Sequence, residues 1–513
     1  MQRLTMIYVV NIILLNGDRV LTSDVETPKN ILFILIDDLR HLSDKKVYLP
    51  NINFLGKTGA TFNNAFAQQA LCAPSRNSLL TGRRPDSLRL YDFYSYWRDR
   101  SNGQGNFTTI PQFFKEHGYD TYSVGKVFHP GKSSNFTDDY PYSWSEYPYH
   151  PPTEMYKDAK VCRNKKTKKL ERNLICPVSV KRQPGQSLPD LQSLDYAIDF
   201  LKKRNGSKPF FLAIGFHKPH IPLKFPKEYL KQMPISKVHR PKEPNIPKDM
   251  PLVSWHPWTD VRKRDDIRRL NITFPFGVMP TKWTLKIRQS YYAAALYIDE
   301  LIGILLSYVD MQKTIIVLTS DHGWSLGENG LWAKYSNFDY ALKVPLIFKS
   351  PKLIPTVVHE PVELIDIFPT LVDLTKLSDE IPKCLNHKDT SQLCFEGKSL
   401  VPFIENNSNG LEAFAISQCP RPSVYPQKNS DKPRLKDITI MGYSIRTKRY
   451  RYTEWISFNN TLFTKNWNNN YGIELYDHII DPIESKNLFL VSKYKNIAKV
   501  LSIRLRSSVY VIV

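Results

Sequence analysis

Three apolar stretches of the chain each end in side chains that can bind a metal ion or move a proton. The stretches ILFILI (31–36), FFLAIGF (210–216) and TIIVLTS (314–320) are followed by Asp37 and Asp38, by His217 and His220, and by Asp321 and His322. Adjacent carboxylates at a buried strand end are costly unless a cation neutralises them. A single acidic pair would by itself favour helix capping or loop hydrogen bonding over a metal site. Two matching acidic ends favour a divalent metal, Ca²⁺ or Mg²⁺, because both prefer oxygen ligands.

The segment LCAPSRNSLLTGRRPD (71–86) holds the densest motif in the chain. Through C-x-P-S-R followed by L-x-T-G-R it resembles the sulfatase family, for which this pattern is highly specific. Further stretches resemble one branch of that family in the same order, and the resemblance extends from about residue 30 to about residue 490. They are the run from Ala65 to Arg98, GKVFHP (125–130), GFHKPHIP (215–222), SDHGWSLGENGLWAKYSNFD (320–339) and SDKPRLKDITIMGYSIRT (430–447).

This resemblance implies that a formylglycine-generating enzyme converts Cys72 to formylglycine, whose hydrate carries two geminal hydroxyl groups. One hydroxyl would attack the sulfur of a sulfate ester and displace the sugar oxygen. The other would then lose its proton, re-form the aldehyde and expel sulfate, so that the reaction is split into two easier steps. A sulfate monoester is a stable anion, and its attack therefore needs a metal ion and Lys or Arg side chains that neutralise charge.

The resemblance also assigns roles to individual positions. The implied metal ligands are Asp37, Asp38, Asp321, His322 and an oxygen of the modified Cys72, around Ca²⁺ or alternatively Mg²⁺. Imidazole is an unusual ligand for Ca²⁺, which prefers oxygen. Arg76 is implied to hold the hydrate, and Lys126 and Lys334 are implied to bind the sulfate oxygens. His129 would take the proton in the elimination step. His220 would contact sulfate or protonate the leaving sugar oxygen, with Lys334 as the competing acid.

Other polar and aromatic residues have both a structural and a functional interpretation. Trp324 is either a core residue or a sugar-facing wall of the substrate site. His217 is expected to orient its neighbour through packing or a backbone hydrogen bond. Arg446 and Lys448 either reach a substrate carboxylate or lie on the surface. Asp299, on a long amphipathic segment, is expected to form a structural ion pair.

The implied substrate is a sulfated glycosaminoglycan oligosaccharide, heparan sulfate or dermatan sulfate, which would lose the 2-O-sulfate of L-iduronate. The alternatives are a sulfatase of another specificity and a secreted, catalytically inactive homologue that binds glycosaminoglycans. A phosphatase or phosphodiesterase of the same superfamily would need Ser or Thr in place of Cys72. The chain departs from the resembled branch at Asn329 and Lys343, where that branch has histidines. It also departs after Arg40, where the loop of this chain is shorter than the loop of that branch.

The elements that must position these residues alternate between strands and helices. VPLIF (344–348) adds a fourth apolar strand, and 191–204 and 287–310 have helical periodicity. This alternation predicts an α/β fold whose large domain has a mostly parallel sheet covered by helices on both faces. The segment 438–455 alternates like antiparallel strands and predicts a smaller C-terminal α+β domain. The polar run IENNSNG (404–410) marks the boundary, giving a catalytic domain at 28–403 and a smaller domain at 411–513.

The composition indicates a globular protein with an anionic partner. The 513 residues include 71 Lys and Arg against 49 Asp and Glu, a formal net charge of +22, and 42% are hydrophobic. A disordered chain is excluded. A basic surface favours polyanions, although many basic runs are simply solvated. No nucleic-acid-binding motif is present, so we expect no nucleic acid partner.

The N-terminus and the cysteines indicate export. Residues 1–24 have the basic start and apolar run of a signal peptide, and no later stretch approaches the roughly 20 residues of a membrane span. No stable membrane insertion is expected after signal removal. Cys162/Cys176 and Cys384/Cys394 are local pairs suited to disulfides, whereas Cys72 and Cys419 are left over. Six glycosylation sequons begin at Asn106, Asn135, Asn205, Asn271, Asn406 and Asn459. The expected destination is the lysosome, with the extracellular space as the alternative.

Overall fold

The structure is a computed structural model. It describes residues 29–42, 47–99, 105–164, 167–204, 206, 208–377, 382–386, 388–407 and 413–510. The predicted signal peptide and the sequon at Asn205 lie outside these residues. Within them, no helix combines the length and apolar character that a membrane crossing requires.

The large sheet has seven strands in the order β13-β2-β12-β9-β1-β7-β3. Its strands are β1 (Asn30–Ile36), β2 (Ala60–Phe66), β3 (Asp120–Gly125), β7 (Phe210–Phe216), β9 (Thr314–Ser320), β12 (Lys343–Lys349) and β13 (Thr356–Glu363). All run parallel except β12, which is antiparallel to both of its neighbours. The predicted α/β fold with a mostly parallel sheet is confirmed.

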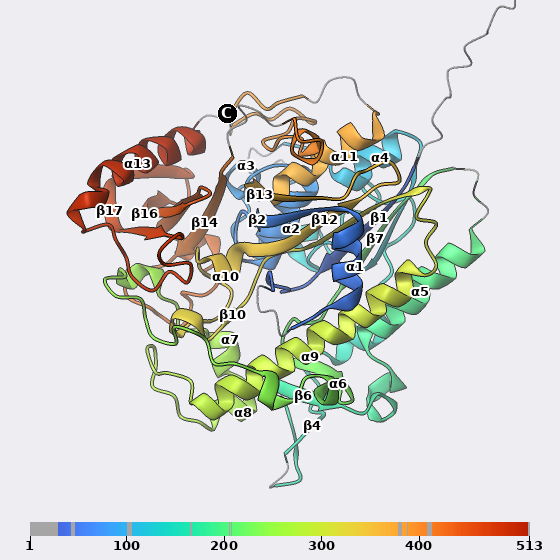
Figure 1. The fold of residues 1–513 in the computed structure, drawn as a ribbon, viewed down its shortest axis with the longest axis horizontal. Helices are drawn as coiled ribbons and strands as arrows, with labels where there is room; N and C mark the ends of the chain where they lie inside the picture. The colour runs from blue at the N-terminus through green and yellow to red at the C-terminus, as the bar shows by residue number, and fades with distance from the viewer. Residues whose placement is uncertain are drawn as a thin grey trace, which may run out of the picture.

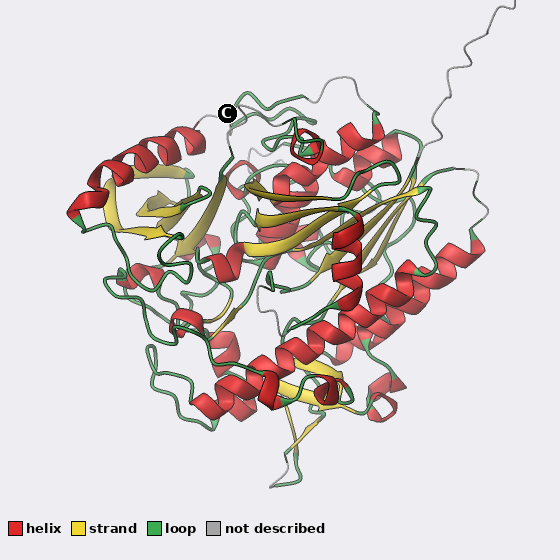
Figure 2. Cartoon of the chain, viewed as in Figure 1, coloured by secondary structure: helices red, strands yellow, loops and turns green. Residues whose placement is uncertain are grey.

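Helices cover both faces of this sheet, as Figures 1 and 2 show. In β1, Leu32 and Ile34 face one core while Ile31 and Phe33 face the other, and all four side chains are fully buried. One core is closed by α1 (Pro50–Thr58), α5 (Pro189–Lys203) and α9 (Thr281–Leu306), the other by α2 (Cys72–Thr81), α4 (Ile110–Glu116) and α11 (Ile367–Thr375). Burial on both faces explains why the central strands read as continuous apolar runs.

The sequence did not reveal β2, β3 and β13, all of which lie toward the two edges of the sheet. Half-exposed polar residues interrupt each of them, so none has the apolar run of a central strand. The remaining helices are α3 (Pro85–Leu88), α6 (Tyr229–Gln232), α7 (Thr259–Arg262), α8 (Asp265–Arg268), α10 (Asp339–Leu342) and α12 (Val401–Ile404). The remaining short strands are β4 (Cys162–Arg163), β5 (Leu170–Glu171), β6 (Ile175–Val178), β8 (Leu223–Pro226), β10 (Ser325–Leu326) and β11 (Trp332–Ala333).

A separate antiparallel sheet forms the C-terminal part of the protein. Its order is β14-β15-β16-β17, and α13 (Lys495–Tyr510) packs on it. The strands are β14 (Ala415–Arg421), β15 (Ile440–Arg446), β16 (Tyr450–Asn459) and β17 (Thr464–Asp477). β14 docks on the large sheet, because the Gln418 N–H donates to the carbonyl of Gln68 over 2.7 Å. Residues 408–412 are not described, and the boundary between 28–403 and 411–513 stays a prediction.

Both predicted local disulfides are present, Cys162–Cys176 and Cys384–Cys394. Cys72 and Cys419 are free and buried, so the two leftover cysteines do not form a third bridge. Four sequon asparagines are exposed in the structure: Asn135, Asn271, Asn406 and Asn459. Asn106 is half-buried, and its side-chain oxygen accepts a hydrogen bond from Arg98 over 2.6 Å.

The expectation of an ion pair at Asp299 is wrong. Its carboxylate, on α9, accepts hydrogen bonds from the backbone N–H groups of Asn51 (3.1 Å) and Ile52 (2.8 Å) in the first turn of α1. No ion pair involves it within the described part of the chain. Since the first N–H groups of a helix have no partner inside the helix, Asp299 caps α1 from another element.

We predict that Asp299→Ala lowers the free energy of unfolding by about 2 kcal/mol, because two N–H donors lose their acceptor. Asp299→Asn keeps one acceptor oxygen and should cost less. Asp199→Ala, which removes an exposed carboxylate on α5, serves as the control. The three variants are compared by chemical denaturation, and equal stability of Asp299→Ala and Asp199→Ala would contradict the capping role.

Candidate active site

The carboxyl ends of neighbouring parallel strands bring the predicted metal ligands together. Asp37 and Asp38 follow β1, and Asp321 and His322 follow β9, its neighbour in the sheet. The backbone N–H groups of Asp38 and His322 both donate to Oδ1 of Asp321, over 3.1 and 3.0 Å. All four residues are buried. This edge of an α/β sheet is where ligands gather in such folds.

Helix α2 places Cys72 and Arg76 over this edge. The two residues are four positions apart and therefore share a helix face. Arg76 donates from Nε to Oδ2 of Asp321 over 2.9 Å and from Nη2 to Oδ1 of Asp37 over 3.0 Å. Its side chain is completely buried. The planar guanidinium thus links the acidic residues that follow two different strands.

Two lysines complete the cluster from other segments. Lys126, directly after β3, donates from Nζ to Oδ2 of Asp37 over 2.6 Å. Lys334, directly after β11, donates to Oδ1 of Asp38 over 2.9 Å and contacts the Cys72 sulfur at 2.8 Å. Both ammonium groups are buried, so they compensate the carboxylates without competition from bulk water.

The two adjacent carboxyls differ in their acidity. Burial raises the pKa of Asp37, but the charge of Lys126 and its other cationic neighbours holds that pKa well below its usual range. At Asp38, burial raises the pKa; Lys334 opposes this, whereas repulsion from Asp37 and Asp321 adds to it, and the pKa rises to about 7. The three carboxylates are matched in number by Arg76, Lys126 and Lys334, and burial is the main cause of the raised pKa of Asp38.

The donor set fits a divalent cation. Ligand atoms of Asp38, Cys72 and His322 lie within 4.8 Å of one another, as do those of Asp37, Cys72 and Asp321. Oδ2 of Asp38 is buried and has no hydrogen-bond partner. Nδ1 of His322 lies 3.0 Å from the carbonyl of Gly323 and must donate to it, which leaves a lone pair on Nε2 facing Asp38 and Cys72. Burial lowers the pKa of His322 to about 4, so the imidazole is neutral, as a metal ligand requires.

The Cys72 side chain is not an activated thiol. Burial raises its pKa to about 12, against the attraction of Lys126 and Lys334. A nucleophilic cysteine needs the opposite shift, because the thiolate is the reactive form. The environment of Cys72 therefore does not support catalysis by the unmodified thiol.

Two further histidines stand beside the cluster. His129 packs on the ring of Phe93, with ring centroids 4.4 Å apart, and its buried Nδ1 has no hydrogen-bond partner. Nδ1 of His220 lies 2.6 Å from the carbonyl of Ile221 and donates to it, so the lone pair of Nε2 points to Asp38, 3.9 Å away. Burial and nearby lysines lower the pKa of both imidazoles well below the usual value.

A pocket of about 640 Å³ opens above Cys72. His129, His220, Lys334 and Trp324 all line it, so Trp324 belongs to the wall of the site as well as to the core. A second cavity of about 280 Å³ lies against Asp37, Lys126 and the two histidines. The structure thus brings together every residue that the sequence assigned to the site.

The structure also shows pocket residues that sequence analysis missed. Other residues that the sequence offered as candidates do not line the pocket. The missed cations are Lys132, Lys157, Arg264 and Lys432. Lys432 lay only within the matched run 430–447, and no local spacing marked any of the four as pocket residues. Arg446 and Lys448 do not line the pocket; they pair with Asp339 and Glu360 instead. Asn329 and Lys343, the two departures from the resembled branch, are also absent from the residues that line it.

Comparison with known proteins settles the family. The family model "Sulfatase" matches residues 29–377. The iduronate 2-sulfatase of Homo sapiens is 48% identical over 90% of this chain and 91% of its own length. The chain belongs to the sulfatase family. The iduronate 2-sulfatase of Mus musculus is 46% identical over 91% of each chain, and this protein is accordingly a sulfatase, a hydrolase.

Solved structures share the fold of this sulfatase. A protein bound to its substrate D-glucosamine-2-N,6-O-disulfate superposes with a TM-score of 0.66 at 21% identity, covering 94% of this chain and 97% of that one. The phosphonate monoester hydrolase of Silicibacter pomeroyi has a TM-score of 0.68 at 19% identity, covering 94% and 95%. At these identities the likeness establishes the architecture alone.

An array of histidines and carboxylates supports the two histidine-bearing loops of the sulfatase site. His217 lies 3.3 Å from Glu154 and 3.4 Å from Asp190, and its carbonyl accepts the backbone N–H of His220. His150 lies 3.3 Å from Glu154 and 3.2 Å from Asp138. The expected orienting role of His217 agrees with this backbone hydrogen bond.

The stabilisation by His150 should depend on pH. Hydrogen bonds to Asp138 and Glu154 raise its pKa from 6.5 to about 10. A raised folded-state pKa stabilises the protein fully below the unfolded value, and this stabilisation is lost as the pH rises from about 6.5 through about 10. We expect His150→Gln to lower the unfolding midpoint most at pH 5 and least near pH 10. His239→Gln, at an exposed histidine, is the control; a deficit for His150→Gln that does not change with pH would contradict this sign.

Proposed function

We propose that this sulfatase removes the 2-O-sulfate from L-iduronate residues of heparan sulfate and dermatan sulfate. The observation that carries the proposal is the 48% identity to human iduronate 2-sulfatase, which extends over 90% of the chain. The cationic cluster around Cys72 supports it, because a sulfate ester needs charge neutralisation on its oxygens. Intact catalytic residues argue against an inactive glycosaminoglycan-binding homologue.

Asp37, Asp38, Asp321 and His322 would hold the divalent ion, Ca²⁺ or alternatively Mg²⁺. When bound, the ion supplies positive charge against the sulfate oxygens. The three carboxylates supply the oxygen ligands that both ions prefer, and the bare Nε2 of His322 adds a nitrogen. Arg76 keeps the carboxylates oriented, because it bonds Asp37 and Asp321 at once.

Cys72 would be converted to formylglycine by a formylglycine-generating enzyme, and the hydrated aldehyde supplies the hydroxyl nucleophile. Position 72 lies at the first turn of α2, directly beneath the pocket, with Lys334 at its side. Lys126 and Lys334 would bind the sulfate oxygens, and Trp324 would form a wall for the sugar. These pocket residues would thus hold the sulfur atom of the sulfate ester next to residue 72 and restrict the approach of water.

Two histidines would move the protons. His129 is neutral, because burial lowers its pKa, and its unpaired Nδ1 can accept a proton in the elimination step. His220 would contact sulfate or protonate the leaving sugar oxygen from Nε2, the nitrogen that its bond to the Ile221 carbonyl leaves available. Lys334 is the competing acid, and nearby carboxylates hold its pKa well above the usual value despite burial. Lys334 therefore holds its proton firmly, whereas Nε2 of neutral His220 must first take up a proton before it can act as the acid.

Export completes the proposal. Two disulfides fit an oxidising compartment, and the glycosaminoglycan substrate is found in lysosomes and outside cells. We propose a secretory-pathway protein with a lysosomal destination and the extracellular space as the alternative.

We predict that Cys72→Ala abolishes sulfate release without unfolding the protein, because only the modified residue supplies the nucleophile. The assay measures sulfate released from a terminal 2-O-sulfated iduronate disaccharide, at acidic and neutral pH, after co-expression with a formylglycine-generating enzyme. Mass spectrometry of the Cys72 peptide verifies the modification, and Cys419→Ala is the matched control. Normal turnover by Cys72→Ala would sink the mechanism; no turnover by fully modified wild type would exclude this substrate.

We predict that chelation removes activity and lowers the thermal unfolding midpoint, because Asp37, Asp38 and Asp321 lose their neutralising ion. Added Ca²⁺ should restore both properties in wild type. Asp321→Asn should lower kcat by about 100-fold or more and show a much smaller Ca²⁺-dependent shift of the midpoint. Asp310→Asn, an exposed aspartate beyond α9, is the control. A chelated enzyme with full activity and an unchanged midpoint would contradict the metal site.

A further inference from the structure

The mouth of the pocket carries cations that the proposed chemistry does not use. Lys132, Lys157, Arg264 and Lys432 line it, against the carboxylates of Asp158 and Asp260. Lys432 is already neutralised, because its ammonium donates to both oxygens of Asp260 over 2.9 and 2.7 Å. Arg264 is paired with Asp158 over 2.7 Å, so the excess positive charge of the rim lies on Lys132 and Lys157.

Lys157 has no carboxylate partner among the residues that the structure describes, although it lines both cavities of the site. Its charge reaches the chemistry: burial lowers the pKa of His129 and of His220, and Lys157 lowers both further. Because Lys157 lines both cavities together with His129 and His220, it can reach a substrate bound beside them.

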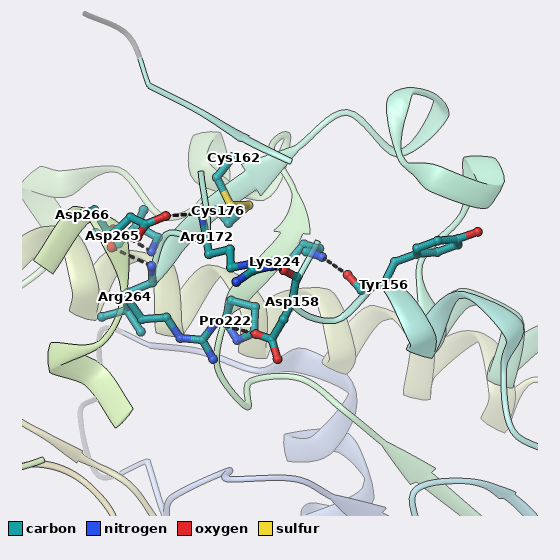
Figure 3. The surroundings of a disulfide bond; sticks show 12 residues. Tyr156, Asp158, Cys162, Arg172, Cys176, Pro222, Lys224, Arg264, Asp265 and Asp266 are labelled. Carbon is teal, nitrogen blue, oxygen red and sulfur yellow. Dashed lines mark hydrogen bonds and ion pairs between the residues drawn. A yellow bond between two sulfur atoms is a disulfide. The ribbon is translucent and has the colours of Figure 1, made fainter. Parts of the chain in front are cut away.

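The backbone around Lys157 is held firmly from behind. The Lys224 ammonium donates to the carbonyls of Tyr156 (2.8 Å) and Lys157 (3.2 Å). Arg172 donates from Nε to the carbonyl of Asp158 over 2.8 Å. Figure 3 shows these contacts beside the Cys162–Cys176 disulfide. Such contacts fix the backbone from which Lys157 extends, so the segment itself needs little ordering when a ligand binds.

Arg264 is fixed beside the same segment. Its Nη1 donates to Oδ1 of Asp158 over 2.7 Å, and its side chain is only 15% exposed. Asp158 occupies one edge of the guanidinium and leaves further N–H donors of the planar group toward the pocket that both residues line. A partly buried arginine with donors to spare is suited to a carboxylate or sulfate.

We propose that Lys157 and Arg264 form a second anion-binding subsite. It would take a carboxylate or sulfate group that lies beside the scissile sulfate ester on the same oligosaccharide. The reaction that this subsite would assist rests on the proposed function, whereas the binding of an anion by Lys157 and Arg264 does not. Two sources of the anion share this chemistry: the carboxylate of the uronate ring itself and a sulfate on the adjoining sugar.

Steady-state kinetics with matched substrates test the subsite. The substrates are a 2-O-sulfated iduronide, its carboxyl-reduced counterpart, and a disaccharide with or without a sulfate on the adjoining glucosamine. Lys157→Ala and Arg264→Gln should each raise KM by about 5- to 10-fold for the substrates that carry the recognised anion, with a much smaller change in kcat. The rise in KM should be absent for the substrate that lacks the recognised anion. That substrate therefore identifies whether the anion is the uronate carboxylate or the sulfate on the adjoining sugar.

The controls are Lys160→Ala and Lys263→Gln, exposed lysines on the same two segments that do not line the pocket. The subsite is overturned if they raise KM as much as the test variants do. It is also overturned if Lys157→Ala raises KM equally for substrates with and without the second anion.

Equilibrium binding separates this inference from the proposed function. The same ligands are titrated calorimetrically into full-length Cys72→Ala protein, with and without Lys157→Ala. A weaker affinity for doubly anionic ligands only, in a protein whose modified wild type does not hydrolyse 2-O-sulfated iduronate, would support the subsite and reject the proposed function. Unchanged affinity, together with normal hydrolysis by wild type, would reject the subsite and leave the proposed function standing.

Discussion

Three buried carboxylates cannot share one sheet edge unless positive charge surrounds them. Asp37, Asp38 and Asp321 would repel one another strongly without compensation, because little water is present to screen them. Arg76 and two lysines supply that charge, and burial, together with repulsion from Asp37 and Asp321, raises the pKa of Asp38 to about 7. The same cluster of charges underlies the proposed binding of a metal cation and of a sulfate anion at this site.

The fold meets this requirement with elements that are far apart in the sequence. Strands β1 and β9 supply the carboxylates, α2 supplies Arg76, and the segments after β3 and β11 supply the lysines. Each element is anchored in a core of fully buried apolar side chains, so the charged groups need little reorganisation when a substrate binds. The packed sheet therefore holds the charged groups in fixed positions.

The outer pocket depends on a different kind of support. The disulfide, Lys224 and Arg172 hold the segment that carries Lys157, and the array of His150, Glu154 and His217 holds the loops beside it. These contacts join surface segments rather than core strands. A change in these contacts therefore need not disturb the charge cluster.

The sequence by itself determined the family, the acidic strand ends and the central strands, and it predicted Cys72 as the position of the nucleophile. Each of these is carried by a local signal: a dense motif such as C-A-P-S-R, or an apolar run that must be buried on both faces. Strands β2, β3 and β13 were not predicted because half-exposed polar residues interrupt their apolar runs.

Only the tertiary structure decided which surface charges meet. It placed Lys157 and Arg264 at the pocket, paired Arg446 with Asp339, and turned Asp299 into a cap for α1. None of these outcomes follows from spacing along the chain, because the partners are separated by tens to hundreds of residues. They depend on where loops and helices come to rest, and that is fixed by packing of the whole molecule.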